Sequence, residues 1–331
     1  MSETLRILST ITSNPRRLEE LERGVSAVSE RTGHPVSLSC ARDEEEILEE
    51  IGGAHVLLTY RLSPRKFRSA ECLEWVHFGA AGVDHSLFGE LLDSDVVLST
   101  SKGIHADVMG EYAVMAVIAL ACGLPQLVDA QRHRTWAGRE IRPLHHAVEG
   151  KRLLVLGFGN TGEPAARKAA ALGMRVTAVK RTPPRDPVPR WLEGLFPIDR
   201  LEGLLPAADY LLLALPLTPE TEGLMDRERL RTLPRGAGVV NMARGGLLDE
   251  GALLDALDSD HLRGAVLDCF ETEPLPEGSR FWKHPKVLVT PHMSGNFDDY
   301  TRRVIERFLE DLERYLKDEP LPHPIDREAG Y

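Results

Sequence analysis

The first hundred residues alternate between short apolar runs and amphipathic segments. The interval 43–51 places Ile47, Leu48 and Ile51 on one side of a helix. Strands that alternate with helices predict a parallel sheet with helices on both faces. The apolar runs, each predicted to be a strand, are 5–9, 36–39, 55–58, 75–79 and 96–99.

A second series of predicted strands begins after residue 151 and also alternates with helical segments. Ahead of it, the apolar run 112–124 is too short to span a bilayer and predicts a buried helix. Behind it, 298–316 has apolar residues at helical spacing and predicts a long amphipathic helix, followed by an extended proline-rich strap over 319–331. The predicted strands of this series are 152–157, 174–179, 210–215, 237–242, 264–268 and 286–290.

The two series predict an α/β protein with two doubly wound parallel-sheet domains. We expect one domain to be discontinuous, made of residues 1–101 and 296–331, and the other to be the stretch between them, 102–295. A chain of 331 residues is long enough for each domain to bury its own core.

Charge and cysteine content narrow the class of protein. The formal net charge of −11 argues against a non-specific nucleic-acid binder and against a protein held on an anionic membrane. We expect four buried, reduced thiols, with neither disulfides nor a metal site, because the cysteines are far apart and form no Cys-x-x-Cys pair. Since no secretory leader precedes them, we also expect a cytoplasmic protein. The cysteines are Cys40, Cys72, Cys122 and Cys269.

Residues 152–172 contain the strongest binding motif. Gly157, Gly159 and Gly162 have the G-x-G-x-x-G spacing, with an apolar strand before them and an Ala-rich helix after them, which is the context that confirms this motif. The first glycine permits a tight turn, the second lets the backbone approach a pyrophosphate, and the third allows close helix–strand packing. The amides of Asn160 and Thr161 would face the phosphates. The stretch therefore predicts a Rossmann domain that binds a dinucleotide.

The end of the next predicted strand carries cations where an NAD-binding unit usually has an acid. Lys180, Arg181 and Thr182 follow that strand directly, and the nearest acid, Asp186, comes several residues later. An acid there would repel a 2′-phosphate, whereas these residues supply charge-assisted donors for one. We therefore expect a preference for NADP, with NAD possible. A solvated basic loop without a cofactor role is the alternative.

Polar residues follow three of the later strands, and the carboxyl ends of strands are where an open α/β sheet collects reactive groups. Arg244 follows the first of the three strands, and His292 follows the last. Two acids, Glu271 and Glu273, follow the strand between them. These strand ends together carry a guanidinium, an acid and an imidazole, which suit one reaction.

Five motifs in this order resemble the D-isomer-specific 2-hydroxyacid dehydrogenase family: "VLGFGNTG", "LPLTPETEGL", "NMARGG", "LDCFETEPLP" and "VTPHMSG". The resemblance extends over nearly the whole chain, with "FGAAGVDH" upstream and "RYLKDEPLP" near the end. It is most similar to the short, glyoxylate/hydroxypyruvate reductase-like form without a regulatory domain. The resemblance implies a Rossmann cofactor domain inserted in a flavodoxin-like substrate domain, with the active site in the cleft between them.

The resemblance also implies the catalytic roles. Arg244 would hold the substrate carboxylate and polarise the ketone. His292 would donate a proton to the carbonyl oxygen as hydride arrives from the nicotinamide. Glu273 would orient His292 and stabilise its protonated form. Glu271 is the rival for this role, but the proline after Glu273 matches the E-P pair of the family.

Further positions follow from the resemblance. The loop at 78–84 would bind the substrate carboxylate through the amides of Ala81 and Gly82. Asp268 would face the nicotinamide carboxamide, and Trp282 would close the active site. Cys269 stands where a valine is common, and we expect no role for it; the contacts of Tyr112 stay open. Other expected cofactor-lining residues are Leu215, Pro216, Thr221 and Ala243, and Tyr60 and Arg61 either touch substrate or form a surface loop.

The function implied is reversible, NADPH-dependent reduction of a small 2-keto acid, such as glyoxylate or hydroxypyruvate, to the D-2-hydroxy acid. One alternative is an NAD-linked D-lactate or phosphoglycerate-type dehydrogenase, and another is a dinucleotide-sensing regulator of the corepressor type. The segment 131–150 resembles the dimerisation arm of the family, so we expect a homodimer. We expect no nucleic-acid or membrane partner.

Overall fold

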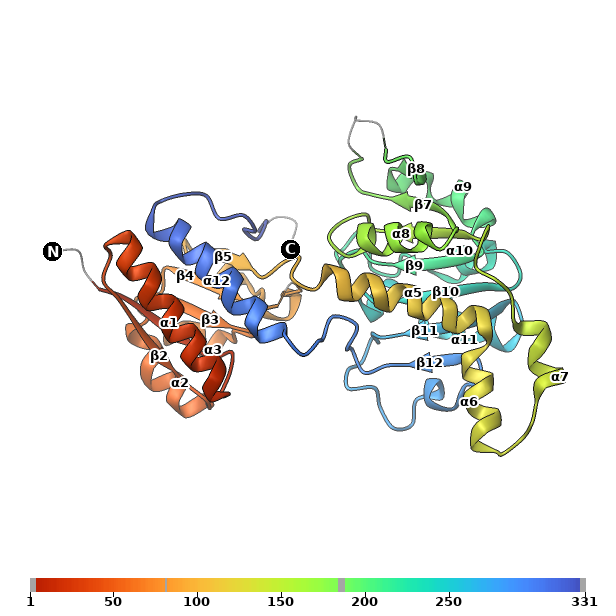
Figure 1. Cartoon of the computed structure of the whole chain (residues 1–331), viewed down its shortest axis with the longest axis horizontal. Helices are drawn as coiled ribbons and strands as arrows, with labels where there is room; N and C mark the ends of the chain where they lie inside the picture. Colours follow the sequence, from red (N-terminus) through yellow and green to blue (C-terminus); the bar gives the residue numbers. More distant parts are fainter. Residues whose placement is uncertain (1–3, 81, 184–187, 328–331) are drawn as a thin grey trace. The chain divides into compact units, whose positions relative to one another are not determined.

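The structure is a computed structural model that describes residues 4–80, 82–183 and 188–327. The chain divides into two compact units (Figure 1): unit 1 combines Met1–Ile104 with Phe297–Tyr331, and unit 2 is His105–Asn296. The chain passes from one unit to the other between residues 104 and 105 and again between 296 and 297. The sequence predicted these boundaries at 101/102 and 295/296. Each unit is described by itself below.

Unit 1 is built on a parallel sheet of five strands in the order β2-β1-β3-β4-β5, which is the flavodoxin-like order. The inner strands β3 and β4 are buried along their whole length because helices cover the sheet on both faces, whereas the edge strand β2 alternates apolar and polar residues. The strands are β1 (Leu5–Ser9), β2 (Val36–Cys40), β3 (Val56–Thr59), β4 (Trp75–Phe78) and β5 (Val97–Thr100).

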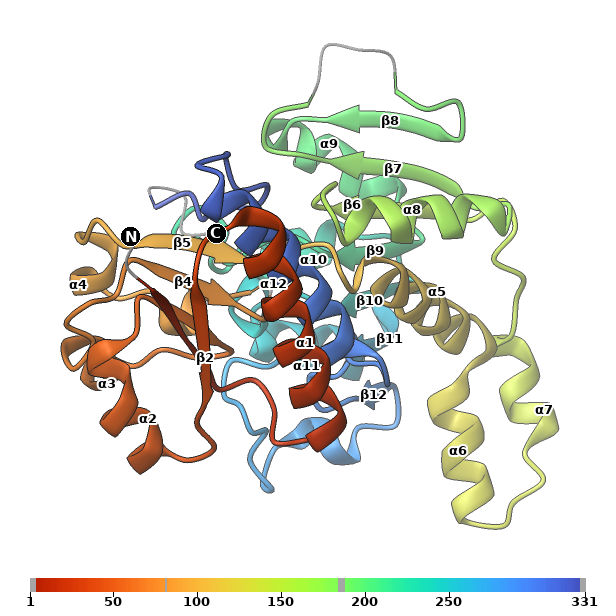
Figure 2. The ribbon, with the colours of Figure 1, turned by 60° about the vertical axis from the view of Figure 1, so that its left-hand side comes forward.

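Successive side chains of these strands point to opposite faces of the sheet, and each face has its own hydrophobic core. Ile7 packs with α1 (Pro15–Thr32) and α12 (Tyr300–Leu316), whereas Leu8 packs on the opposite face. Figures 1 and 2 show α1 and α12 side by side, although nearly the whole chain separates them in sequence. The opposite face is covered by the short helices α2 (Glu44–Glu50), α3 (Pro64–Arg68) and α4 (Gly89–Leu92).

The tail that follows α12 covers an edge of this sheet. The N–H of Thr100 donates to the carbonyl of His323 at 3.2 Å, and the N–H of Ile325 donates to the carbonyl of Leu98 at 3.0 Å. Ile325 is buried in the core. The expected extended strap is therefore confirmed over residues 319–327, and 328–331 lie outside the described residues; the strap satisfies backbone groups of the edge strand β5.

Unit 2 has a parallel sheet of seven strands in the order β12-β11-β10-β9-β6-β7-β8. The strand order reverses between β6 and β9, which is the doubly wound Rossmann arrangement. The predicted fold class, with a Rossmann unit inserted in a flavodoxin-like unit, is confirmed. The strands are β6 (Arg152–Leu156), β7 (Arg175–Val179), β8 (Leu192–Phe196), β9 (Tyr210–Leu213), β10 (Ala237–Asn241), β11 (Leu262–Leu267) and β12 (Val287–Val289).

Helices cover both faces of this second sheet. On one face, α5 (Ala106–Cys122) crosses α8 (Gly162–Ala171) closely: a Cβ at Gly110 would lie 3.1 Å from the backbone carbon of Pro164. The other face is covered by α9 (Leu201–Leu204), α10 (Arg227–Thr232) and α11 (Glu250–Asp258). The segment after α5 forms α6 (Leu124–Arg132) and α7 (Gly138–Ile141).

The structure corrects two expectations. The strand β8 was not predicted; it is an edge strand in which Glu193 and Gly194 interrupt the apolar run. All four cysteines carry thiols and none is in a disulfide, as expected, but only Cys269 is buried. Among the described residues, no single helix is long and apolar enough to cross a membrane, and α5 and α6 reach that length only as a pair bent by 66°.

Candidate active site

The glycine loop lies at the end of β6, where the strand order of the sheet reverses. Gly157 has a φ of +98°, a left-handed conformation that glycine adopts without strain. A Cβ at this position would lie 2.5 Å from the carbonyl oxygen of Ala214, and one at Gly162 would lie 1.7 Å from the carbonyl oxygen of Gly157. Both positions therefore require glycine.

The space beside Gly159 is open. Gly159 is exposed, and a Cβ there would meet no atom within 4 Å. Asn160 is exposed too, and Thr161 is the half-buried N-cap residue of α8. Because the positive end of a helix directs N–H groups outward, the loop offers an open, anion-favouring surface without side-chain obstruction at Gly159.

The basic stretch follows the end of β7. Lys180, Arg181 and Thr182 are exposed, and the N–H of Lys180 donates to the carbonyl of Phe196 at 2.9 Å. The pKa of Glu220 is lowered, mainly by the hydrogen bond from Thr218 and also by the charge of Arg181. The loop after β9 therefore lies within electrostatic range of this basic stretch.

The other residues expected to line the cofactor lie on loops after β9 and β10. Leu215 packs on the core, and Pro216 is exposed. The hydroxyl of Thr221 donates to the carbonyl of Pro216 at 2.8 Å and accepts from the N–H of Thr218 at 2.8 Å, so it holds the shape of its loop. Ala243 is half-buried after β10.

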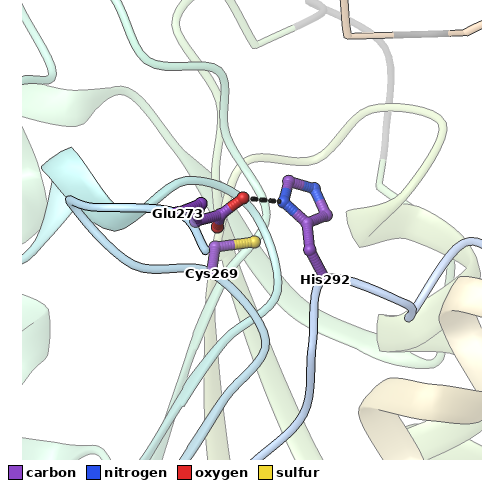
Figure 3. A group of neighbouring side chains, drawn as sticks. All are labelled: Cys269, Glu273 and His292. Carbon is purple, nitrogen blue, oxygen red and sulfur yellow. Dashed lines mark hydrogen bonds and ion pairs between the residues drawn. The ribbon is translucent and has the colours of Figure 1, made fainter. Parts of the chain in front are cut away.

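Glu273 and His292 form a hydrogen-bonded pair (Figure 3). His292 Nδ1 lies 2.7 Å from Glu273 Oε2, and the other carboxylate oxygen accepts from the N–H of Phe270 at 3.0 Å. The His292 and Glu273 side chains are 45% and 35% exposed, so solvent or a substrate can reach them. Glu273, not Glu271, therefore contacts the imidazole, and ring nitrogen Nε2 is the one left to face another molecule.

Asp268 holds the turn that carries His292. Its Oδ1 accepts from the N–H of Met293 and its Oδ2 from the N–H of Ser294, both at 2.9 Å. The N–H of His292 donates to the Asp268 carbonyl at 2.9 Å, and His292 has a φ of +49°, which is unusual for a residue with a side chain. Asp268 is fully buried. Its carboxylate is thus a positioning group; the expected nicotinamide contact stays a prediction.

Two residues that sequence reasoning did not assign complete this network. Thr290 Oγ1 donates to Asp268 Oδ1 at 2.6 Å, and Tyr112 Oη lies 2.5 Å from Thr290 Oγ1. Burial raises the pKa of the Tyr112 phenol, so Tyr112 stays protonated. Its hydroxyl donates a hydrogen bond to Thr290 Oγ1, because the Thr290 hydrogen is directed at Asp268. For Thr290, the sequence offers one indication of a role in the site: it lies at a strand end, just before the Pro-His pair.

Arg244 lies beside the Glu273 segment. Its Nη1 donates to the carbonyl of Ala243 at 2.7 Å, and its own carbonyl accepts from Asn241 Nδ2 at 2.8 Å. The next residue, Gly245, touches the neighbouring loop so closely that a Cβ would lie 1.9 Å from the backbone carbon of Phe270. Arg244 as a whole is half-buried. The chain thus holds Arg244 next to the loop that leads to Glu273.

Cys269 also points into this site, as Figure 3 shows. A sulfur, a carboxylate oxygen and an imidazole nitrogen, from Cys269, Glu273 and His292, all lie within 4.8 Å of one another. The thiol donates to the carbonyl of Ala243 at 3.2 Å. Neither a role for Cys269 nor a set of metal ligands was expected from the sequence.

The residues expected to bind substrate are spread over both units. In unit 1, Tyr60 is half-buried and packs where the loop 78–84 begins: a Cβ at Gly79 would lie 2.7 Å from its ring. Arg61 is exposed and Gly82 half-buried, whereas Ala81 lies outside the described residues. In unit 2, Trp282 is 48% exposed, and its Nε1 donates to the carbonyl of Pro276 at 2.9 Å.

Comparison with known proteins gives one family. The sequence profile described as "D-isomer specific 2-hydroxyacid dehydrogenase, NAD binding domain" matches residues 114–294. A D-3-phosphoglycerate dehydrogenase of Methanocaldococcus jannaschii is 26% identical over 287 residues, which cover 86% of this chain and 54% of that protein. The chain thus matches only about half the length of that relative.

Two relatives match over nearly their full length. A glyoxylate reductase of Pyrococcus horikoshii is 29% identical over 300 residues, covering 87% of this chain and 89% of that protein. The crystal structure of an NADPH-dependent glyoxylate/hydroxypyruvate reductase from Sinorhizobium meliloti, in complex with NADP and sulfate, has a TM-score of 0.81 and 28% identity. It covers 98% of this chain and 99% of that chain.

Proposed function

This chain belongs to the D-isomer specific 2-hydroxyacid dehydrogenase family, and from that premise we propose that it reduces a small 2-keto acid with NADPH. The substrate class is glyoxylate, hydroxypyruvate or a similar acid, and the product is the D-2-hydroxy acid. The observation that carries the proposal is the 2.7 Å pair of Glu273 and His292. An imidazole held in this way by a carboxylate is suited to donate a proton and to take it back.

The glycine loop would hold the cofactor. Gly159 provides the close approach that a pyrophosphate needs, and the start of α8 provides positive partial charge. Asn160 and Thr161 would donate their backbone N–H groups to the phosphates. The bound nicotinamide would supply the hydride for reduction of the ketone carbon.

The protein groups would supply binding and the proton. Arg244 would bind the substrate carboxylate with its planar fork of donors and polarise the ketone. His292 Nε2 would donate a proton to the ketone oxygen as that oxygen gains negative charge, so the oxygen becomes the hydroxyl of the product. Glu273 would stabilise the imidazolium through Nδ1, and in oxidation the same imidazole would take the proton back.

The preference for NADP rests on Lys180, Arg181 and Thr182. They follow β7, where an acid would bind the ribose of NAD, and they are exposed and cationic or hydroxylated. The Sinorhizobium relative, described as NADPH-dependent, supports this choice. A 2′-phosphate would receive charge-assisted hydrogen bonds here, each worth about 1.5–3 kcal/mol before solvent screening reduces it.

The first experiment measures oxidation of NADPH, and separately of NADH, by the purified protein with a panel of 2-keto acids. In the double variant Lys180→Ala/Arg181→Ala, we expect KM for NADPH to rise by about 10- to 100-fold, with KM for NADH changed by less than about threefold. Arg175→Ala, at the other end of β7, is the matched control and should leave both values unchanged. A wild-type preference for NADH would refute the phosphate clamp and leave the reductase proposal standing.

The alternatives are separated by the same assay. The panel includes pyruvate and phosphohydroxypyruvate, because phosphoglycerate dehydrogenases are among the relatives. Rapid turnover of either acid with NADH, but not with NADPH, would favour an NAD-linked D-lactate or phosphoglycerate-type enzyme. Binding of both nucleotides without turnover of any acid would favour a dinucleotide-sensing regulator.

We further propose a cytoplasmic homodimer that pairs through the arm 131–150 and its neighbours. Trp136 on this arm is 100% exposed, and Leu127 and Leu144 are 43% and 38% exposed, so the segment offers apolar surface to a second copy. Analytical ultracentrifugation tests the assembly, and a monomer at micromolar concentration would contradict it.

A further inference from the structure

We propose that Cys269, Glu273 and His292 form a site for Zn²⁺, and that zinc bound there inhibits the enzyme. The ligand atoms would be Cys269 Sγ, a Glu273 carboxylate oxygen and, because it is the ring nitrogen that faces Glu273, His292 Nδ1. The binding of zinc follows from the side chains alone, whereas the inhibition rests on the proposed function of His292. The two parts of the proposal are therefore tested separately.

The three atoms nearly have the spacing that zinc requires. They lie within 4.8 Å of one another, and His292 Nδ1 is 2.7 Å from Glu273 Oε2. Tetrahedral zinc with bonds of about 2.0 to 2.3 Å separates its ligand atoms by about 3.3 to 3.6 Å. The imidazole and the carboxylate must move apart by about half an ångström, and the sulfur must approach by about one ångström at most. Small side-chain rotations supply both movements.

The donor set suits zinc in kind. Thiolate, imidazole and carboxylate are its usual ligands, and sites with three protein ligands keep the fourth position for water. Two of the ligands are open to solvent, with 45% of the His292 side chain and 35% of the Glu273 side chain exposed, so an ion can enter. Cys269 is buried, and its sulfur points toward the Glu273 and His292 side chains (Figure 3). The ion would therefore meet a thiol that is shielded on its other sides.

Protons leave when the ion binds. The Cys269 thiol loses its proton, together with the hydrogen bond to the carbonyl of Ala243, and becomes the thiolate ligand. Zinc takes the place of the hydrogen that His292 Nδ1 shares with Glu273. No oxidation or reduction is involved, and the released protons pass to solvent.

Zinc at this position would remove the acid that the reaction uses. The ion replaces the Glu273 contact, which stabilises the imidazolium, and its own double positive charge opposes a further proton on His292. His292 Nε2 would then have no proton that it can easily give to the ketone oxygen. None of the three ligands belongs to the glycine loop, so nucleotide binding should persist in the zinc-loaded protein.

The metal test uses Co²⁺ as a spectroscopic substitute for zinc on protein treated with chelator. In the wild type we expect a thiolate-to-cobalt charge-transfer band that saturates at one equivalent and disappears when Zn²⁺ is added. Cys269→Val should lack this band. Cys72→Ser, which removes another free thiol, is the matched control and should keep it. A missing band in the wild type, or a band that persists in Cys269→Val, overturns the site.

The inhibition test compares each variant with its own metal-free rate. We expect Cys269→Val to need at least about 10-fold more Zn²⁺ than the wild type for half inhibition, because a ligand is lost. Cys72→Ser should match the wild type. Equal zinc sensitivity in Cys269→Val and the wild type overturns the inhibitory role. A cobalt band that depends on Cys269, in a protein that turns over no 2-keto acid, would support the site and contradict the proposed reductase function instead.

Discussion

Asp268→Asn tests whether the buried carboxylate positions His292. An aspartate offers two oxygens, which accept from Thr290, from Met293 N–H and from Ser294 N–H. Asparagine keeps one oxygen. If that oxygen takes the place of Oδ1, the amide NH₂ faces the N–H of Ser294, and two donors then meet in a fully buried place.

The cost follows from that lost contact. A hydrogen bond to a charged group is worth about 1.5–3 kcal/mol, and a buried donor left without an acceptor costs about 1–3 kcal/mol. The two contributions describe partly the same lost contact, so we take about 2–4 kcal/mol as the total cost of Asp268→Asn to the geometry of the His292 turn. At about 1.4 kcal/mol for each factor of ten in rate, kcat should fall by about 30- to 1000-fold.

The assay is steady-state reduction of the best 2-keto acid, with nucleotide affinity measured separately by fluorescence. Tyr112→Phe is the matched control, because it removes a hydroxyl from the same network and leaves the three hydrogen bonds to the Asp268 carboxylate in place. It should lower kcat by less than about 10-fold, since a neutral hydrogen bond contributes about 0.5–1.5 kcal/mol. Asp268→Asn should keep the nucleotide dissociation constant within about threefold of the wild type, so that its effect appears in kcat.

Two results would refute the reasoning. A folded Asp268→Asn protein with kcat within about threefold of the wild type would show that the turn does not need the carboxylate. A loss confined to nucleotide affinity, with kcat unchanged, would instead favour the nicotinamide contact expected from the sequence.

Two further predictions concern the glycine loop and a buried histidine. Gly159→Ala should lower nucleotide affinity by at least about 10-fold without changing the melting temperature, because the new methyl meets no protein atom and fills the space for the pyrophosphate. Gly162→Ala should lower the melting temperature itself, since its Cβ would overlap the carbonyl of Gly157, and equal melting temperatures for the two variants would contradict this contrast. Burial lowers the pKa of His77 below its ordinary value of 6.5, and the Asp311 carboxylate offsets this only in part. Because the unfolded chain then binds a proton that the folded chain does not, stability should fall as pH drops below about 6.5 and return as pH rises. The melting temperature should therefore fall more between about pH 7.5 and about pH 5.5 in the wild type than in His77→Gln, and an equal fall would contradict the assignment.

The inner strands of both sheets could be predicted because parallel strands buried on two faces form nearly uninterrupted apolar runs. The run at β6 shows this: Leu153 and Val155 enter one core, while Leu154 and Leu156 enter the other. The exception, β8, lies at the edge of its sheet, where half-exposed positions remove the apolar signal.

The parts of the site that the sequence could predict are those fixed by strand order. Glu273 and His292 follow neighbouring strands, β11 and β12, so their meeting was expected. The contact of Tyr112 with Thr290 joins residues 178 positions apart and depends on how α5 lies on the sheet, which no local pattern specifies. The position of Cys269 in a motif likewise does not tell whether its sulfur faces the imidazole.

The split of unit 1 around unit 2 has a consequence for biosynthesis. A ribosome finishes the contiguous stretch 105–296 before it makes α12. In the folded protein, Phe308 of α12 is fully buried and stacks on Trp75, with the two ring centroids 5.5 Å apart. Until then the nascent N-terminal sheet exposes the apolar face that α12 covers, which is a surface that chaperones and proteases recognise. A translation product that stops near residue 296 would thus contain a complete unit 2 but an N-terminal sheet without α12. We expect proteases to degrade it, because the apolar face that α12 covers would stay exposed.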